Sequence, residues 1–335
     1  MKIKVGINGM GRIGRMIIRS IVENNYSNFE IKHINNRTNS ETCSNLLKYD
    51  SIHGKFDAEI KFDQNNLIVN NNKITFSQET DINKIDWKKF NVDYVFECTG
   101  KFNSKDKLFP HINNGAKKVI VSAPCKDADK TIVFGVNEKD IKVEDKIISA
   151  ASCTTNCLAP VAHILNENFE IDKAFMTTIH AFTSDQRILD NSHKDPRRSR
   201  SASQSIVPTS TGASKAIGEI IPSLKGKIEG IAMRVPIPNV SLIELVFCSK
   251  KEVSIEKINS AFKNFIKDQN KKILEITNEK LVSIDFNHNS ASSIIDASLT
   301  KVVGKNMGKI TAWYDNEWGF SNRMCDIAEY IHKSS

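Results

Sequence analysis

A glycine-rich turn between a short strand and a helix constrains the fold of this chain more than any other feature. Apolar residues alternate over residues 3–7, which predicts a strand. The sequence GMGRIG follows at residues 9–14, and apolar residues at helical spacing then continue to residue 22. In this setting the first glycine permits a tight turn, the second lets a pyrophosphate approach the backbone, and the third lets helix and strand pack closely. The helix N-terminus favours anions, so the pattern predicts a dinucleotide-binding unit.

The other strands of the first half extend this unit into a parallel sheet. Short apolar runs, separated by helix-length or turn-length segments, lie at residues 31–34, 92–96, 119–121, 132–136 and 147–148. Strands that alternate with helices indicate an α/β fold. We therefore expect a Rossmann-type parallel sheet over roughly the first 150 residues.

The second half of the chain has a different pattern. Residues 173–180 and 241–248 are longer strand-like segments rich in β-branched and aromatic residues, and residues 255–266 form an amphipathic helix pattern. This combination predicts an α+β domain with a mainly antiparallel sheet. A long polar stretch, residues 183–204, contains HKDPRRSRS, and loops of this length in compact domains are usually functional or disordered.

Length, charge and cysteine content narrow the class of protein. The 335 residues suggest about two domains. The chain has no long apolar run, and its N-terminus resembles neither a secretory signal nor a transit peptide, so we expect no membrane span and a cytoplasmic protein. The seven cysteines form no C-x-x-C pair and no metal-ligand cluster, so we expect neither a disulfide framework nor a metal. The net charge of +8 is spread along the chain without a basic arm, which favours a solvated surface or a site for phosphorylated metabolites over nucleic acid.

The segment SAASCTTNCLAP at residues 149–160 carries the candidate nucleophile. Small hydroxylic residues before an apolar-periodic segment predict the start of a helix. A thiol at a helix N-terminus has its pKa lowered from about 8.5, because the thiolate meets the positive end of the helix dipole. We therefore expect Cys153 to be reactive, whereas Cys157, one turn later, is expected to be buried in the helix.

Two further positions gain a role only if the fold places them correctly. A thiolate near neutral pH needs an imidazole neighbour, and His180 ends the strand predicted at residues 173–180. The residues alone leave open whether His180 lies beside Cys153 or is a structural histidine. Asn36 and Arg37 follow the second strand, where an acid usually bonds the ribose 2′-OH. Arg37 could pair with a 2′-phosphate or simply face solvent, and this alternative also stays open.

Taken together, these residues resemble those of phosphorylating glyceraldehyde-3-phosphate dehydrogenases. The resemblance runs from end to end and includes the blocks GINGMGRIGR, LLKYDSIHG, ASCTTNCLAP, TTIHAFTSDQ, STGASKAIG, MRVPIPNVS and WYDNEWGFSNR. It implies a dinucleotide-binding domain of residues 1–151 and 317–335, to which the C-terminal helix returns, and a catalytic domain of residues 152–316. It also implies a homotetramer.

The resemblance implies a reversible reaction in which D-glyceraldehyde 3-phosphate, NAD(P) and inorganic phosphate give 1,3-bisphosphoglycerate, as in glycolysis and gluconeogenesis. Cys153 attacks the aldehyde, His180 acts as its base and oxyanion partner, and hydride transfer leaves a thioester that phosphate cleaves. The implied ligands of the substrate phosphate are Thr183, Asp185 and Arg234, and those of the attacking phosphate are Ser152, Thr154, Arg198, Thr211 and Gly212. The implied cofactor contacts are Gly9, Gly11, Arg12, Ile13, Gly14, Asn36, Arg37, Thr99, Ser122, Asn191, Ser192 and Asn316, of which Asn316 fixes the carboxamide.

Departures from the strictly NAD-dependent members favour NADP as a cofactor, used alongside NAD. Asn36 replaces the Asp of those members, and Asn191 and Ser192 replace their Leu-Pro in the loop before the arginine run. Polar residues there resemble members that accept NADP, whose 2′-phosphate is reached from a neighbouring subunit's loop. Two other departures are Ala150 in place of Asn near the nucleophile and Phe320 in place of Tyr near the nicotinamide.

Two alternatives remain on sequence alone. Erythrose-4-phosphate dehydrogenase, which hydrolyses its acyl-enzyme, is similar in the segments RSRSASQSIVP, IDFNHN and DNEWGFSNRM, whereas Thr183, Thr211 and Gly212 keep the phosphorylating pattern. A catalytically silent nucleotide- or RNA-binding protein would keep the cofactor groove, but the presence of Cys153, His180 and both sets of phosphate ligands argues against it.

Overall fold

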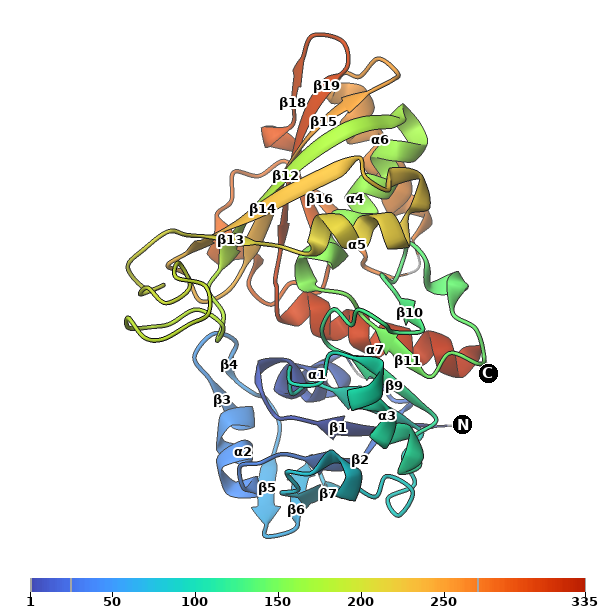
Figure 1. Ribbon diagram of the computed structural model, residues 1–335, viewed down its shortest axis with the longest axis vertical. Helices are drawn as coiled ribbons and strands as arrows, with labels where there is room; N and C mark the ends of the chain where they lie inside the picture. Colours follow the sequence, from blue (N-terminus) through green and yellow to red (C-terminus); the bar gives the residue numbers. More distant parts are fainter. Residues whose placement is uncertain (1, 25, 270, 335) are drawn as a thin grey trace. The chain divides into compact units, whose positions relative to one another are not determined.

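The computed structural model describes residues 2–24, 26–269 and 271–334, which form two compact units (Figure 1). Unit 1 comprises Met1–Phe134, Glu138–Ala151 and Ser321–Ser335, and unit 2 comprises Gly135–Asn137 and Ser152–Phe320. Each unit is built on its own large sheet.

Unit 1 contains a nine-stranded sheet in the order β10-β11-β9-β8-β1-β2-β7-β6-β5. Its parallel strands are β1 (Ile3–Asn8), β2 (Phe29–Asn35), β7 (Asn72–Ser77), β8 (Tyr94–Glu97), β9 (Lys118–Val121), β10 (Lys130–Thr131) and β11 (Ile147–Ser149). An antiparallel edge is formed by β5 (Ile60–Asp63) and β6 (Asn66–Val69), and β3 (Tyr49–Asp50) pairs with β4 (Gly54–Lys55). Its helices are α1 (Arg12–Glu23), α2 (Ser40–Lys48), α3 (Lys105–Asn113) and most of α7 (Trp318–Lys333). The predicted Rossmann-type parallel sheet is confirmed.

The strand predicted at residues 132–136 is wrong. β10 ends at Thr131, and residues 134–136 form a turn in which Gly135 has a φ of 88°. Ile132 and Val133 are nevertheless fully buried. The apolar run therefore records the burial of a connecting segment, which periodicity cannot distinguish from a buried strand.

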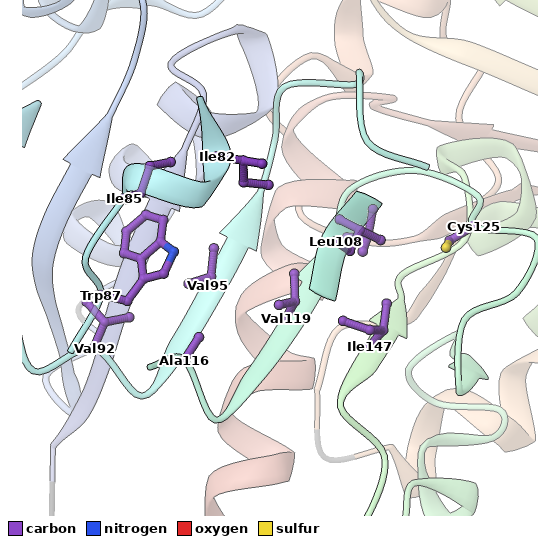
Figure 2. Packing of buried hydrophobic residues seen from close by; sticks show 11 residues of the cluster. Ile82, Ile85, Trp87, Val92, Val95, Leu108, Ala116, Val119, Cys125 and Ile147 are labelled. Atoms are coloured by element: carbon purple, nitrogen blue, oxygen red, sulfur yellow. The ribbon is translucent and has the colours of Figure 1, made fainter. Parts of the chain in front are cut away.

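A cluster of buried apolar side chains packs the sheet of unit 1 against α3. Val95 and Val119 come from neighbouring strands and Leu108 from α3, and Trp87 lies beside them (Figure 2). The indole N–H of Trp87 donates to Nδ1 of His111 over 2.8 Å, so this large buried ring has its polar atom satisfied. The packing holds the strand that leads into Thr99, a residue of the candidate cofactor pocket.

Unit 2 contains a mainly antiparallel sheet in the order β13-β14-β12-β15-β19-β17-β16, with β18 on β19. The strands are β12 (Ile171–Ala181), β13 (Val207–Ser210), β14 (Ile228–Val235), β15 (Ser241–Ser249), β16 (Leu274–Thr277), β17 (Ser293–Asp296), β18 (Lys301–Val303) and β19 (Met307–Tyr314). The helices are α4 (Cys153–Phe169), α5 (Ala213–Ile220) and α6 (Ile255–Asp268). The predicted α+β class is confirmed, and within it β12 and β14 run parallel.

The sheet of unit 2 has one covered and one open face. Buried and partly exposed residues alternate along the whole of β15, as expected for a strand packed on one side. The buried side is covered by α4, α5 and α6 (Figure 1). Phe175 and Ile231 lie on the opposite side and are exposed.

The end of the chain belongs to unit 1. Asn322 accepts a hydrogen bond from the hydroxyl of Ser20, and Asp326 accepts one from Tyr26. These contacts dock α7 beside α1. Within the described residues, no helix is both long and apolar enough to cross a membrane, and no group of three His, Cys, Asp or Glu side chains could hold a metal ion.

Candidate active site

The candidate nucleophile stands at the first position of α4. Ser152 is the N-cap residue, and its Oγ accepts the backbone N–H of Thr155 over 3.1 Å. Ala151 precedes it with a φ of 59°, a left-handed conformation that costs energy for a residue other than glycine. The predicted helix start is confirmed. The turn presents Cys153, which is partly exposed, while Cys157 is fully buried as expected.

The parallel pair β12 and β14 brings the imidazole to this thiol. His180 and Arg234 face each other in register near the carboxyl ends of the two strands. Nε2 of His180 lies 3.5 Å from Sγ of Cys153. The residues that sequence reasoning could not place together are therefore adjacent, and both belong to unit 2.

Nδ1 of His180 decides what Nε2 can do. It lies 2.6 Å from the carbonyl oxygen of Ala181 and 2.7 Å from Nη1 of Arg234. Nδ1 cannot donate to the carbonyl and accept from the guanidinium at the same time. When Nδ1–H donates to Ala181, Nε2 is unprotonated and faces the thiol as a base. When Nδ1 accepts from Arg234, Nε2 carries the hydrogen and can donate to a thiolate.

Desolvation disfavours the charged form of both members of the pair. It lowers the pKa of His180 to about 3, and the charge of Arg234 acts in the same direction. Burial also raises the pKa of Cys153, although Arg234 and the backbone N–H of Thr154 oppose this. The expected lowering of the pKa of Cys153 is therefore wrong, because desolvation outweighs the helix N-terminus. The base nearest to the thiol is Nε2 of His180, 3.5 Å from Sγ.

Tyr314 is a functional candidate that sequence reasoning missed. It is buried under the site, with its ring edge-on to His180 at a centroid distance of 5.9 Å. Its hydroxyl bonds Thr154 Oγ1 over 2.9 Å and Thr178 Oγ1 over 3.0 Å. The hydroxyl of Thr154, expected at a phosphate, is thus turned toward Tyr314. Only the block WYDNEWGFSNR pointed to this part of the chain, and nothing in it singled out the tyrosine.

Two of the arginines predicted to bind phosphate, Arg234 and Arg198, differ in their surroundings. Arg234 is largely buried, and its Nε has no hydrogen-bond partner among the described residues. A buried unpaired guanidinium donor suits an anionic ligand such as a phosphate oxygen. Arg198 pairs with Asp185 and with Asp195, and it donates to the carbonyl of Ser210 over 3.2 Å. Asp185 thus contacts a guanidinium in this structure, and its own carboxylate would repel a phosphate.

The remaining predicted phosphate ligands sit on loops around these arginines. Thr183 donates its N–H and its hydroxyl to Oε1 of Gln186, at 3.0 and 3.2 Å. Gln186 is buried and is a second residue that the sequence did not single out. Thr211 and Gly212 precede α5, with Gly212 as the N-cap residue, and a Cβ on Gly212 would meet open space. The start of α5 therefore offers backbone N–H groups at an open position.

Asn316 is buried at the end of β19, and its carboxamide has a fixed partner. Oδ1 accepts the hydroxyl hydrogen of Ser241 over 2.9 Å. The other predicted cofactor ligands of unit 2, Asn191 and Ser192, are exposed on the loop between β12 and β13. There Arg187 donates to the carbonyl oxygen of Ser192 over 2.9 Å.

The glycine turn of unit 1 has the geometry that a dinucleotide requires. Gly9 has a φ of 101°, and a Cβ there would lie 2.8 Å from the backbone nitrogen of Thr99. A Cβ on Gly14 would lie 2.0 Å from the carbonyl oxygen of Gly9. The third glycine is therefore needed for the close approach of helix and turn. Gly11, by contrast, faces open space on the pocket side, with its nearest neighbour 3.9 Å away.

A pocket opens beside this turn. Of the predicted cofactor ligands, its lining includes Gly9, Gly11, Asn36, Arg37 and Thr99. Arg12, Ile13, Gly14 and Ser122 lie outside the lining. Arg12 instead forms a bidentate pair with Asp50, at 2.5 and 3.0 Å.

The charge of the pocket comes from Arg37 and Lys101 against one acid, Glu79. Oε1 of Glu79 already accepts the backbone N–H groups of Thr80 and Asp81. Oδ1 of Asn36 accepts the backbone N–H of Met10 over 3.0 Å, which ties the end of β2 to the glycine turn.

A buried carboxylate, Glu97, lies behind two residues of the pocket lining and is another residue that the sequence did not single out. Glu97 accepts hydrogen bonds from Asn8, Thr99 and Nε2 of His111. Because the indole of Trp87 can only donate, Nδ1 of His111 must accept, so Nε2 carries the hydrogen that reaches Glu97. The network holds Asn8 and Thr99, both in the lining, in fixed orientations.

Unit 2 holds a thiol beside an imidazole and a buried arginine, and unit 1 holds the glycine-turn pocket. These features are those of an NAD(P)-dependent aldehyde dehydrogenase that works through a cysteine. The comparisons with known proteins are more specific. Residues 3–105 match the model for the NAD binding domain of glyceraldehyde 3-phosphate dehydrogenase, and residues 152–316 match that for its C-terminal domain. The chain belongs to the glyceraldehyde-3-phosphate dehydrogenase family.

Full-length relatives support this assignment. The chain is 48% identical to glyceraldehyde-3-phosphate dehydrogenase 2 of Bacillus subtilis (strain 168) over 332 residues, covering 99% of this chain and 97% of the relative. It is 49% identical to glyceraldehyde-3-phosphate dehydrogenase of Geobacillus stearothermophilus over 334 residues, covering 99% and 98%. It is 50% identical to the enzyme of the same name from Priestia megaterium (strain DSM 319 / IMG 1521), covering 99% and 98%.

Proposed function

We propose that this chain oxidises D-glyceraldehyde 3-phosphate with NAD(P) and transfers the acyl group to inorganic phosphate, giving 1,3-bisphosphoglycerate in a reversible reaction. The observation that carries the proposal is the 3.5 Å approach of Nε2 of His180 to Sγ of Cys153 at the start of α4. Unit 1 then serves as the dinucleotide-binding domain and unit 2 as the catalytic domain.

The first step follows from the neutral thiol–imidazole pair. Sγ of Cys153 attacks the aldehyde carbon while its proton passes to Nε2 of His180, and the imidazolium donates to the developing oxyanion. Drawing the guanidinium of Arg234 toward the substrate phosphate frees Nδ1 to donate to the carbonyl of Ala181. That hydrogen bond leaves Nε2 unprotonated, so binding of the phosphorylated substrate prepares the base.

The second half of the reaction needs a hydride acceptor and a second anion. The bound nicotinamide supplies the hydride acceptor, and His180 takes the hydroxyl proton as the thiohemiacetal on Cys153 becomes a thioester. Inorganic phosphate then attacks the thioester carbon and restores the thiol.

Arg234 and Thr183 are proposed to hold the substrate phosphate, with Asp185 acting through Arg198. The attacking phosphate is assigned to Arg198, Thr211, Gly212, Ser152 and the backbone N–H of Thr154. Both sets lie within unit 2.

The activity test compares two aldehydes with and without phosphate. Phosphate-dependent reduction of NAD(P)⁺ with glyceraldehyde 3-phosphate, abolished in Cys153→Ser, would support the proposal. Phosphate-independent oxidation of erythrose 4-phosphate as the faster reaction would overturn it. Binding of cofactor by Cys153→Ser shows that the variant is folded.

We further propose that the chain uses NADP as well as NAD and prefers NADP. Arg37 and Lys101 outnumber the single acid of the pocket, and Glu79 is occupied by its own backbone contacts. Asn36 lacks the charge that would repel a 2′-phosphate, and Asn191 and Ser192 offer polar groups on the exposed loop.

The coenzyme proposal is tested by kcat/KM for NADP and NAD. Arg37→Ala should lower kcat/KM for NADP roughly 10-fold or more, because a charge-assisted hydrogen bond is lost, and should leave NAD nearly unchanged. A strong preference for NAD that is unaltered in Arg37→Ala would contradict it. Lys267→Ala, an exposed lysine on α6 in unit 2, is the control.

The assembly is proposed to be a cytoplasmic homotetramer. The open face of the unit 2 sheet exposes Phe175 and Ile231 on long strands, which suits a second copy of the chain. All seven cysteines are free thiols, as is usual for proteins of reducing compartments. The reaction direction in such a compartment, toward breakdown or synthesis of sugars, follows the supply of substrates.

A further inference from the structure

The segment that leads into β15 is joined to the residues directly after β19 by two side-chain hydrogen bonds. Nδ2 of Asn239 donates to Asp315 over 2.9 Å, and Oγ of Ser241 donates to Oδ1 of Asn316 over 2.9 Å. Val240 lies between them with a φ of 64°. A β-branched residue in this conformation is strained, and such strain persists only where the surrounding contacts impose it.

The surroundings of the Ser241 hydroxyl fix which group it accepts a hydrogen bond from and which group it donates to. Its Oγ accepts the backbone N–H of Ala181 over 3.0 Å, just beyond the last registered pair of β12 and β15, Ile179 and Leu242. Within the described part of the chain, Oδ1 of Asn316 is the only acceptor recorded for its hydrogen. Because Ser241 is 1% exposed, that hydrogen cannot be left to water. The carboxamide of Asn316 must therefore turn its oxygen toward Ser241.

This orientation fixes what Asn316 presents to a ligand. With Oδ1 held by Ser241, the remaining polar group is the Nδ2 amino group, which no described residue accepts from. Nδ2 is a donor and matches a carbonyl oxygen, whereas the flipped amide would present an acceptor. The peptide that anchors Ser241 is also the one next to His180, whose Nδ1 contacts the Ala181 carbonyl.

We propose that Ser241 is a positioning residue that sets the amide orientation of Asn316, so that Asn316 donates to the carboxamide oxygen of the nicotinamide. The proposal rests on the function proposed above and adds a residue to it. Ser241 acts only through Asn316. Removing its hydroxyl leaves the amide free to flip and to present the wrong group to the cofactor.

The test is a double-mutant cycle read by equilibrium binding. Dissociation constants for NAD, NADP and ADP-ribose are measured by calorimetry for the wild type, Ser241→Ala, Asn316→Ala and the double variant. ADP-ribose lacks the nicotinamide and reports on the rest of the cofactor site. Ser241→Ala should raise the dissociation constants of NAD and NADP about 3- to 10-fold, the worth of one hydrogen bond, and leave that of ADP-ribose unchanged.

The cycle separates action through Asn316 from a general effect. In the Asn316→Ala background, Ser241→Ala should change NAD binding less than 2-fold, because the two changes remove the same contact. Additive effects, or equal weakening of ADP-ribose and NAD, would overturn the proposal. Ser249→Ala is the matched control. Ser249 is a buried serine at the other end of β15 that donates to the carbonyl oxygens of Lys251 and Asn306. The loss of its hydroxyl should leave the dissociation constants of NAD, NADP and ADP-ribose as in the wild type.

A third variant keeps the proposal testable if Ser241→Ala does not fold. Asn316→Asp still accepts from Ser241 but presents no donor, so NAD binding should weaken while ADP-ribose binding does not. Wild-type NAD affinity in Asn316→Asp would overturn the proposal. If the wild type binds neither NAD(P) nor ADP-ribose, the proposed function fails; if it binds both and the cycle is additive, only the role of Ser241 fails.

Discussion

Arg234 acts on both members of the thiol–imidazole pair. Its charge lowers the pKa of His180 together with burial, and it opposes the burial that raises the pKa of Cys153. The same guanidinium lies 2.7 Å from Nδ1 of His180. A residue proposed to bind the substrate phosphate therefore also tunes the nucleophile, since its position affects the charge near Sγ and the tautomer of the base.

Arg234→Gln is expected to shift the alkylation of Cys153 to higher pH. Only the thiolate reacts, and removing the positive charge leaves burial, which raises the pKa of Cys153, less opposed. The rate of iodoacetamide labelling at Cys153 is followed by mass spectrometry from about pH 6 to 11, which extends well above the ordinary thiol pKa of about 8.5. Arg198→Gln is the matched control, because Arg198 pairs with Asp185 and Asp195 and should leave the midpoint nearly unchanged. A midpoint that stays or falls in Arg234→Gln would contradict this account.

At the level of single residues, sequence reasoning succeeded where chemistry depends on local context. Cys153 stands at a helix start that its hydroxylic neighbours predict, and the structure has that start. The sequence does not reveal the roles of Ser241 and Tyr314, because their hydrogen-bond partners are 75 and 160 residues away in the chain. The pKa of Cys153 was misjudged for a related reason: helix position is local, but the burial that dominates comes from the whole fold.

A buried arginine of helix α1, Arg19, contacts the α2 region. The guanidinium of Arg19 donates twice to the carbonyl of Leu47, at 3.0 and 2.7 Å, and once to that of Gly54 at 3.0 Å. It also lies 5.0 Å from the ring centroid of Phe56. The planar guanidinium satisfies one carbonyl in the last turn of α2 and one in the segment after it, so the position of α2 beside α1 depends on Arg19.

Arg19→Met is expected to lower the free energy of unfolding by about 1–3 kcal/mol, because it leaves the buried carbonyl group of Leu47 without a donor. Urea unfolding monitored by circular dichroism measures the change. Arg19→Lys should recover only part of the loss, since one ammonium cannot reach all the carbonyls. The control is Arg200→Met, where an exposed pair with Asp190 is lost and the change should stay within about 0.5 kcal/mol. Equal small losses at both positions would show that Arg19 does not hold the helix.

Helices and strands were predicted correctly where the spacing of apolar residues fits only one type of element. The segments 173–180, 241–248 and 255–266 became β12, β15 and α6 with bounds shifted by three residues or fewer. At residues 132–136 the same apolar signal came from a buried connection. The sequence also does not show which strands pair with each other. β12 runs parallel to β14 in a mainly antiparallel sheet, and this pairing places His180 opposite Arg234.

At the scale of the whole molecule, the sheet of unit 2 leaves an uncovered apolar surface. Registered pairs place Phe175 opposite Val246 and Thr177 opposite Ile231, so these side chains share one face. Phe175 is 47% and Ile231 is 37% exposed. The opposite face carries His180 and is covered by helices, so the open face is free to meet another copy without touching the catalytic pair.

The double variant Phe175→Glu/Ile231→Glu is therefore expected to give a smaller assembly than the wild type. Two carboxylates would be desolvated at a self-complementary interface, which costs several kcal/mol for each symmetric contact. Sedimentation equilibrium measures the mass, and circular dichroism shows that the fold is retained. Val143→Glu is the matched control, because Val143 is an exposed apolar residue that belongs to unit 1 and not to this sheet, and the variant should keep the wild-type mass. A double variant with the wild-type mass would mean that the open face is not an interface, and the source of any assembly would then have to lie on another surface of the chain.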